Sequence, residues 1–321
     1  MGYDIIGDIH GHADALRALL TKLGYQEVQG VFRHPDRTAI FVGDFIDRGP
    51  KQLESVTIVR RMVDAGAAQA VMGNHEFNAI AWHTPDPDNP DDYLRPHHSP
   101  KYGEKNFKQH QAFLNEVMGT PLHDEIIAWF KTLPLWLDLP GLRVVHGCWH
   151  ARFMDYLSPL LAEGNRLPES LLPAATREPA DEREKDTPEP SIFKAVEALT
   201  KGIEIPLPDG KSFLDKDNIQ RHRVRSRWWD RNAKTYPLAA MLDEATCRTL
   251  PDDPIPEHAR IADQSGKPTF IGHYWLTGTP TLLSPTTACV DYSVAKGGRL
   301  VAYRWNGEAE LTESNFIWVA P

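Results

Sequence analysis

Gly7-Asp8-Ile9-His10-Gly11 opens a series of three glycine-flanked clusters that decide the fold of this chain. The other two are Gly43-Asp44-Phe45-Ile46-Asp47-Arg48-Gly49 and Gly73-Asn74-His75-Glu76. Each cluster follows an apolar run that predicts a β-strand, at residues 3–6, 39–42 and 67–72. Ligands of α/β sheets bind beyond the carboxyl ends of the strands, so we expect the polar side chains of the clusters to meet at one edge. The flanking glycines allow the backbone to take positive φ and to pass close to an ion or a phosphate.

The polar side chains of these clusters are typical of a metal centre. Oxygen ligands suit Mg, Ca and Mn, whereas imidazole suits Zn, Fe, Ni and Cu, so a mixed set favours ions such as Mn²⁺, Fe and Zn²⁺. Asp8 and His10 lie two residues apart, and in an extended chain both would point the same way. Two later apolar runs end in His146-Gly147 and Gly272-His273, which adds a histidine at each of two further strand ends.

Taken together, the five clusters resemble the calcineurin-like metallophosphoesterase superfamily. The patterns GDIHG, GDFIDRG, GNHE, HG and GH follow one another in the family's order over residues 7–273. Within the superfamily they are most similar to the phosphoprotein-phosphatase family, which includes bacterial protein phosphatases and symmetrical diadenosine tetraphosphate hydrolases. The resemblance implies an α/β fold, a metallophosphoesterase β-sandwich of two mixed sheets flanked by helices, with an inserted cap region.

The resemblance also implies metal ligands. Asp8 and His10 match the ligands of a first metal, and Asp44 matches the carboxylate that bridges both metals. The matching ligands of the second metal are Asn74, His146 and His273. The implied cofactor is a pair of divalent ions, with manganese preferred and iron, zinc, nickel or magnesium as alternatives. The implied reaction is attack of a metal-bridging hydroxide on phosphorus.

Three residues of the clusters match the family's catalytic side chains. His75 matches the general acid that protonates the leaving oxygen, and Asp47 matches the carboxylate that orients this histidine. Arg48 matches the phosphate-binding arginine, whose planar fork of donors suits phosphate oxygens. General acid assistance of this kind is typically worth ~10²–10⁴ in rate.

A second phosphate-binding arginine is expected between the fourth and fifth clusters. Residues 221–227 alternate arginine with other residues, so in an extended chain these arginines would share one face. Arg225 and Arg227 are the candidates, and no motif distinguishes them. A solvated edge strand is the alternative interpretation, because charged edges block aggregation.

Four tryptophans lie close to the motifs. They are Trp149, Trp228, Trp229 and Trp275. Two interpretations stay open for them: they belong to the core, or they line the pocket and stack on a base or an aromatic leaving group.

The composition is that of an ordinary enzyme, with 321 residues, 41% hydrophobic and 25% charged. No apolar run approaches the ~18 residues that a membrane span needs. Three cysteines without CxxC spacing favour a reducing cytoplasm and no disulfides. The net charge of −9 argues against binding of a nucleic-acid polymer, so the arginines of 221–227 indicate phosphate recognition.

The pattern along the chain predicts a catalytic domain in two parts, 1–150 and 263–321, separated by an insertion or cap at 151–262. Helices are predicted at 12–23, 51–65, 104–131 and 191–200, a loop at 84–100 and a hairpin at 133–146. Strands are predicted at 269–271, 289–292, 299–305 and 315–319.

The sequence leaves several substrate classes open. It favours a phosphomonoesterase or Ser/Thr protein phosphatase, whose partner is a phosphoprotein. The alternative is a hydrolase of dinucleoside polyphosphates such as diadenosine tetraphosphate. A third hypothesis, a non-catalytic module that binds a phosphorylated ligand, requires lost ligands, whereas every expected metal ligand and His75 are present. The sequence does not indicate an oligomeric state.

Overall fold

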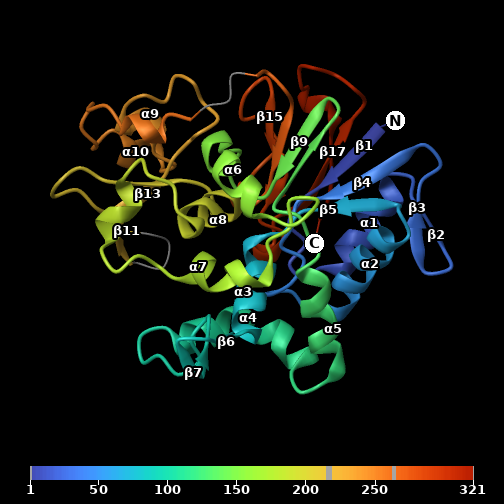
Figure 1. Cartoon of the computed structure of the whole chain (residues 1–321). Helices are drawn as coiled ribbons and strands as arrows, with labels where there is room; N and C mark the ends of the chain where they lie inside the picture. The colour runs from blue at the N-terminus through green and yellow to red at the C-terminus, as the bar shows by residue number, and fades with distance from the viewer. Residues whose placement is uncertain (1, 215–218, 262–264, 321) are drawn as a thin grey trace.

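The computed structural model describes residues 2–214, 219–261 and 265–320, and its main strands form two sheets packed face to face (Figure 1). The first sheet has the order β16-β17-β1-β4-β5, with β18 paired to β17. Its strands span Gly2–Ile6 (β1), Arg37–Phe41 (β4), Ala68–Ala70 (β5), Asp291–Tyr292 (β16), Arg299–Trp305 (β17) and Phe316–Val319 (β18). The second sheet has the order β15-β14-β9-β8. Its strands span Trp136–Leu139 (β8), Leu142–Val145 (β9), Thr269–Ile271 (β14) and Thr287–Cys289 (β15). Both sheets mix parallel and antiparallel pairs.

Neighbouring residues of the central strands face two different cores. Ile5 and Ile40 pack with Phe270 of the second sheet in a cluster between the sheets. Ile6 and Phe41, each one residue further, belong to the cluster under the helices. This alternation follows from the two-residue period of a strand, and it makes β1 and β4 apolar on both faces. The predicted fold class, a β-sandwich flanked by helices, is confirmed.

Helices cover the outer face of the first sheet (Figure 1). They are α1 (Ala13–Lys22), α2 (Gln52–Asp64), α3 (Asn74–His83), α4 (Gly103–Val117) and α5 (Pro121–Phe130). The predicted helices at 12–23 and 51–65 are confirmed as α1 and α2. The helical segment predicted at 104–131 is confirmed as two helices, α4 and α5, because Gly119 takes a φ of 76° and Pro121 begins the second helix. The loop predicted at 84–100 contains a small hairpin, β6 (Pro85–Asp86) with β7 (Asn89–Tyr93).

Residues 151–262 contribute to two different cores. Helices α6 (Ala151–Leu157), α7 (Leu172–Thr176) and α8 (Ile192–Lys201) place buried side chains in the main cluster, which also contains Val145 and Ile271 of the second sheet. Residues 203–259 surround a separate apolar cluster (Figure 1, yellow to orange). Its elements are β10 (Glu204–Pro206), β11 (Phe213–Leu214), β12 (Gln220–Arg221), β13 (Arg223–Arg225), α9 (Tyr236–Ala239) and α10 (Glu244–Cys247). The domain boundaries 151–262 stay a prediction, whereas the helix predicted at 191–200 is confirmed as α8.

The remaining elements are short. One further hairpin joins β2 (Gln26–Val28) to β3 (Val31–Arg33). Single 3-10 turns lie at Ser158–Leu160, Glu169–Leu171, Glu182–Asp186, Glu257–Ala259, Val294–Lys296 and Glu313–Asn315. In the part of the chain that the structure describes, no helix is both long and apolar enough to cross a membrane.

Candidate metal centre

The predicted ligands converge where strands from the two sheets end. The loops after β1 and β4 are joined by backbone hydrogen bonds from Ile9 and His10 to the carbonyl oxygen of Asp44, at 3.0 and 2.9 Å. Two glycines allow the side chains to approach closely. A Cβ at Gly73 would lie 2.2 Å from Oδ1 of Asp44, and one at Gly272 would lie 2.2 Å from Oδ1 of Asp8. Only glycine leaves room for these carboxylates.

Asp44 is common to two groups of potential metal ligands. One group is His10, Asp44 and His75, and the other is Asp44, His146 and His273; within each group the donor atoms lie within 4.8 Å of one another. All of these side chains are buried. A carboxylate shared in this way lies where a bridging ligand of a two-metal site has to lie.

Hydrogen bonds to backbone carbonyls orient two of the imidazoles. Nδ1 of His10 donates to the carbonyl oxygen of Ile46 at 2.9 Å, and Nδ1 of His146 donates to that of Val42 at 2.7 Å. Because a carbonyl only accepts, Nδ1 carries a proton in both rings, and Nε2 is the nitrogen that a metal would bind. That Nε2 atom lies 3.7 Å from Oδ2 of Asp44 in His10 and 3.3 Å in His146. Metal-bound histidines are commonly oriented in this way.

Several polar atoms that face the centre have no hydrogen-bond partner. These atoms show whether the site fits a metal ion. Among the described residues, Oδ1 of Asp8 and the Nε2 atoms of His10 and His273 are buried without one. A buried polar group without a partner is costly, and a divalent ion would satisfy all three. Asn74 completes the set, since its Oδ1 lies 2.7 Å from Nδ1 of His273 and 3.3 Å from Nε2 of His146. The donors present fit divalent metal ions.

The backbone of the site is conformationally strained. Positive φ angles outside glycine are uncommon, and five predicted site residues take them. They are His10 (47°), Asp44 (52°), Asp47 (73°), Arg48 (75°) and His273 (69°). Such strain persists only where the surrounding structure enforces it, and here it aims side chains from separate loops at one point.

Charge interactions in the cluster favour a negative Asp44. Burial alone would raise the pKa of Asp44, but His146 and His75 hold it well below its usual value. Burial would likewise lower the pKa of His146, but Asp44 and Asp8 raise it to about 10. The pKa of Asp8 is raised by burial and by the neighbouring charge of Asp291. Metal ions would relieve this repulsion between carboxylates.

His75 is held by a carboxylate that a second histidine also contacts. Nδ1 of His75 contacts Oδ2 of Asp47, and Nδ1 of His110, on α4, lies 2.8 Å from the same oxygen. Asp47 and His110 are fully buried. Nε2 of His75 faces the centre, 3.9 Å from Oδ2 of Asp44. Burial lowers the pKa of His75, but Asp44 and Asp47 together raise it above its usual value.

Sequence reasoning missed His110, for which we expect a positioning effect on Asp47. The His110→Ala variant should lose ~10–100-fold in kcat and keep its metals, because it removes a support of the His75–Asp47 pair. The loss should be larger for an alkyl phosphate than for an aryl phosphate, since only the poorer leaving group needs the proton. His110→Gln, which retains a donor, should recover part of the rate. Equal losses on both esters in steady-state kinetics would show that His110 acts on the fold alone.

Two buried carboxylates near the centre were given no functional role from the sequence. Glu76, which sequence reasoning left without a role, accepts hydrogen bonds from the backbone N–H groups of Asp44, Phe45 and Gly73 at 2.8, 2.8 and 3.1 Å. Asp291 accepts from the N–H groups of Trp275 and Ser293 at 2.6 and 3.0 Å. The GNHE pattern could have indicated the first, whereas no motif surrounds the second.

The mouth of the centre carries a tryptophan between two cations. The guanidinium carbon of Arg48 lies 4.0 Å from the ring centroid of Trp275, and Nζ of Lys296 lies 4.8 Å from it. The ring centroid of His10 is 5.6 Å away. The other tryptophans near the motifs, Trp149, Trp228 and Trp229, are buried in the main core, so the core interpretation holds for these three, whereas Trp275 is half-buried beside Arg48 and His10.

The structure separates the two candidate arginines. In β13 and the two residues after it, burial alternates as predicted, with Val224 and Ser226 buried while Arg225 and Arg227 are half-buried. Burial lowers the pKa of His273 well below its usual value, and the charge of Arg225 lowers it further, so this guanidinium acts on the centre. The phosphate-binding role of either arginine stays a prediction.

Comparison with known proteins gives the family. The model of the calcineurin-like phosphoesterase family matches residues 1–167, and the chain belongs to this family. A protein of Halalkalibacterium halodurans named bis(5'-nucleosyl)-tetraphosphatase PrpE [asymmetrical] is 50% identical over 76 residues, 23% of this chain and 31% of that protein. A bis(5'-nucleosyl)-tetraphosphatase, symmetrical, of Psychromonas ingrahamii is 30% identical over 141 residues, 44% of this chain and 41% of that protein. The matched segments therefore span well under two thirds of these relatives.

A solved structure described as a putative diadenosine tetraphosphatase is 17% identical to this chain. It covers 99% of this chain and 93% of its own, with a TM-score of 0.48. A protein serine/threonine phosphatase from Saccharomyces cerevisiae is 15% identical, covers 100% of this chain and 79% of its own, and has a TM-score of 0.46.

Proposed function

We propose that this protein is a two-metal phosphohydrolase. The observation that carries the proposal is Asp44, a buried carboxylate common to two groups of metal donors. Asp8, His10 and Asp44 would hold one ion, and Asp44 with Asn74, His146 and His273 would hold the other. When bound, two divalent ions supply a nucleophile from water at neutral pH and neutralise charge on the phosphoryl oxygens. The donor set suits manganese first, with iron, zinc, nickel and magnesium as alternatives.

The protein's own catalytic groups lie beside the centre. Nε2 of His75 faces it and gives a proton to the leaving oxygen as the P–O bond breaks. Asp47 accepts from Nδ1 of the same ring and stabilises the protonated imidazole. Arg48, at the mouth, offers two parallel donors to the phosphoryl oxygens.

Arg225 is the proposed second phosphate ligand. We expect Arg225→Gln to raise KM ~10-fold or more, because a charge-assisted hydrogen bond contributes ~1.5–3 kcal/mol. The matched control Arg227→Gln should change KM by less than about twofold. Steady-state kinetics on an aryl phosphate measures both variants, and an equal rise in KM would contradict the choice of Arg225.

Two substrate classes are compatible with this chemistry. The preference of the sequence for phosphomonoesters or phosphoproteins stays a prediction. The cations favour the alternative, a dinucleoside polyphosphate. Arg48 and Lys296 flank Trp275 at the mouth, and the charges of Arg225 and Lys201 both act on His273. Four cations around one centre suit a chain of phosphates better than a single phosphate. The names of the relatives, which match 23% and 44% of this chain, agree with this choice.

Hydrolysis of three substrates side by side tests the proposal. With Mn²⁺ present, we expect turnover of an aryl phosphate, a phosphothreonine peptide and diadenosine tetraphosphate, with the highest kcat/KM for the dinucleotide. A higher kcat/KM for the peptide would instead support the sequence-based prediction of a protein phosphatase. No turnover of any of the three, with metals bound, would reject the phosphohydrolase itself.

A further inference from the structure

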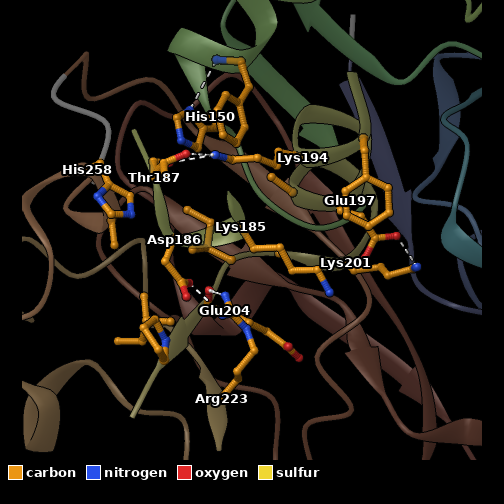
Figure 2. A pocket seen from close by; sticks show the side chains of 18 of the residues that line it. His150, Lys185, Asp186, Thr187, Lys194, Glu197, Lys201, Glu204, Arg223 and His258 are labelled. Atoms are coloured by element: carbon orange, nitrogen blue, oxygen red, sulfur yellow. Dashed lines mark hydrogen bonds and ion pairs between the residues drawn. The ribbon is translucent and has the colours of Figure 1, made fainter. Parts of the chain in front are cut away.

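A separate cavity lies next to the metal centre, within the region that carries none of the five motifs. Its volume is about 220 Å³. Its walls come from the start of α6, residues 178–188, α8, the strands β10 and β13, and His258 (Figure 2). The space suits a small organic group and excludes a folded partner.

Cations outnumber carboxylates in the walls by two. The cations are Arg152, Lys185, Lys194, Lys201, Arg223 and Arg225, and the carboxylates are Glu178, Asp186, Glu197 and Glu204. Each carboxylate pairs with a cation; for example, the Arg223–Asp186 pair has an N···O distance of 2.7 Å. In a chain with a net charge of −9, such a positive cavity is selective for an anion.

The two cations in excess differ in their contacts. Nζ of Lys194 donates to the backbone carbonyls of Glu184, Thr187 and Glu189, at 2.9, 2.7 and 2.7 Å, and so fixes the loop that forms one wall. Arg152 is exposed and forms no ion pair with the described residues. Its guanidinium is therefore available to a ligand.

Aromatic and aliphatic side chains form the rest of the lining. His150 stacks on Phe153, with ring centroids 3.8 Å apart and an interplanar angle of 9°. Burial lowers the pKa of His150 to about 4, so this ring is neutral near pH 7. Phe193 is half-buried, and Ile203 adds an aliphatic surface. Flat apolar surfaces beside cations are the pattern that binds a nucleobase together with its phosphates.

The cavity and the metal centre share a wall. A Cβ at Gly202, which lines the cavity, would lie 2.3 Å from Oη of Tyr274, the residue after His273. Oη of Tyr274 in turn donates to the carbonyl oxygen of Gly147, next to His146. Lys201 and Arg225 line the cavity. A Cβ at Gly147, next to His146, would lie 2.7 Å from the backbone nitrogen of Lys201, so this residue lies on the side of the cavity that faces the centre.

We propose that this cavity binds one nucleoside of a dinucleoside polyphosphate whose scissile phosphoryl group lies at the metal centre. The proposal rests on the phosphohydrolase function and specifies its substrate class. The phosphate chain runs along Arg225 and Lys201, and the base packs against Phe193 and the His150–Phe153 pair.

Two variants with matched controls test the cavity by kinetics. Phe193→Ala and Arg152→Gln should each lower kcat/KM for diadenosine tetraphosphate ~10-fold, mainly through KM, and leave 4-nitrophenyl phosphate unchanged. Ile192→Ala, on the same helix but outside the lining, and Arg183→Gln, on the surface, should change neither substrate. An equal loss on both substrates, or no loss on either, would overturn the proposal.

A binding measurement separates the cavity from the catalytic assignment. The metal-loaded protein is titrated with AMP by calorimetry in the presence of saturating inorganic phosphate, which occupies the centre. AMP should bind, and Phe193→Ala should weaken binding ~10-fold. If an acidic phosphopeptide binds there and AMP does not, the nucleoside assignment is wrong. If AMP binds as expected but no phosphate compound is hydrolysed, the catalytic proposal fails while the cavity still binds a nucleotide.

Discussion

Replacing Asp44 by asparagine is expected to remove both metals from the centre and to abolish hydrolysis. The amide keeps the size of the side chain but loses the negative charge and the ability to donate electron pairs to two ions. Because two-metal stabilisation is worth several kcal/mol, and each 1.36 kcal/mol is tenfold in rate, we expect kcat to fall by more than ~10³. Metal content by mass spectrometry and turnover of an aryl phosphate measure the two effects.

Asp4→Asn is the matched control for Asp44. Asp4 is also a buried carboxylate, but it lies within β1, four residues before Asp8. It forms ion pairs with Arg37 and Arg304 at 3.0 and 2.9 Å. The control should lose stability and keep its metals. An Asp44→Asn variant that holds two metals and remains fully active would disprove the bridging role.

The second large effect is expected for His75→Ala. The variant should keep both metals, because His75 is proposed as an acid and not as a ligand. Its kcat should fall ~10²–10⁴ on a phosphothreonine peptide, whose alkoxide leaving group needs a proton. The fall should be much smaller on 4-nitrophenyl phosphate, whose leaving group departs without one. Steady-state kinetics on both substrates gives the comparison.

His34→Ala, at a half-buried histidine on the turn between β3 and β4, is the control and should change neither rate. Two outcomes would contradict the role of His75. One is full activity on the peptide. The other is loss of metal, which would make His75 a metal ligand. Its donor atom lies close enough to those of His10 and Asp44 for that role.

Much of the fold could be predicted because the motifs coincide with the ends of strands. An apolar run such as 39–42 indicates a strand buried on both faces, and the Gly-Asp that follows it indicates the loop. The order of the clusters indicated the family, and the resemblance to that family predicted the β-sandwich and the strands that lie side by side in it. Residues 104–131 show the limit: the periodicity indicates helix throughout, and the break depends on Gly119 and Pro121.

The part of the site that sequence reasoning missed depends on tertiary packing. His110 lies on α4, 63 positions after Asp47, and its neighbours resemble those of any amphipathic helix. Asp291 follows an apolar strand, as many turn residues do. His110 and Asp291 lie near the centre because of how α4 and β16 pack against it. No local sequence pattern predicts this packing. The cavity lined by residues 150–259 could not be predicted from the sequence for the same reason.

Titration of metal-free protein with Mn²⁺ tests the central claim most directly. Activity on an aryl phosphate is followed as the ion is added, with bound metal counted in the same samples. The proposed centre predicts that activity reaches its plateau at two equivalents per chain, with both ions lost together in Asp44→Asn. A plateau at one equivalent, or activity that persists without metal, would contradict a two-metal centre.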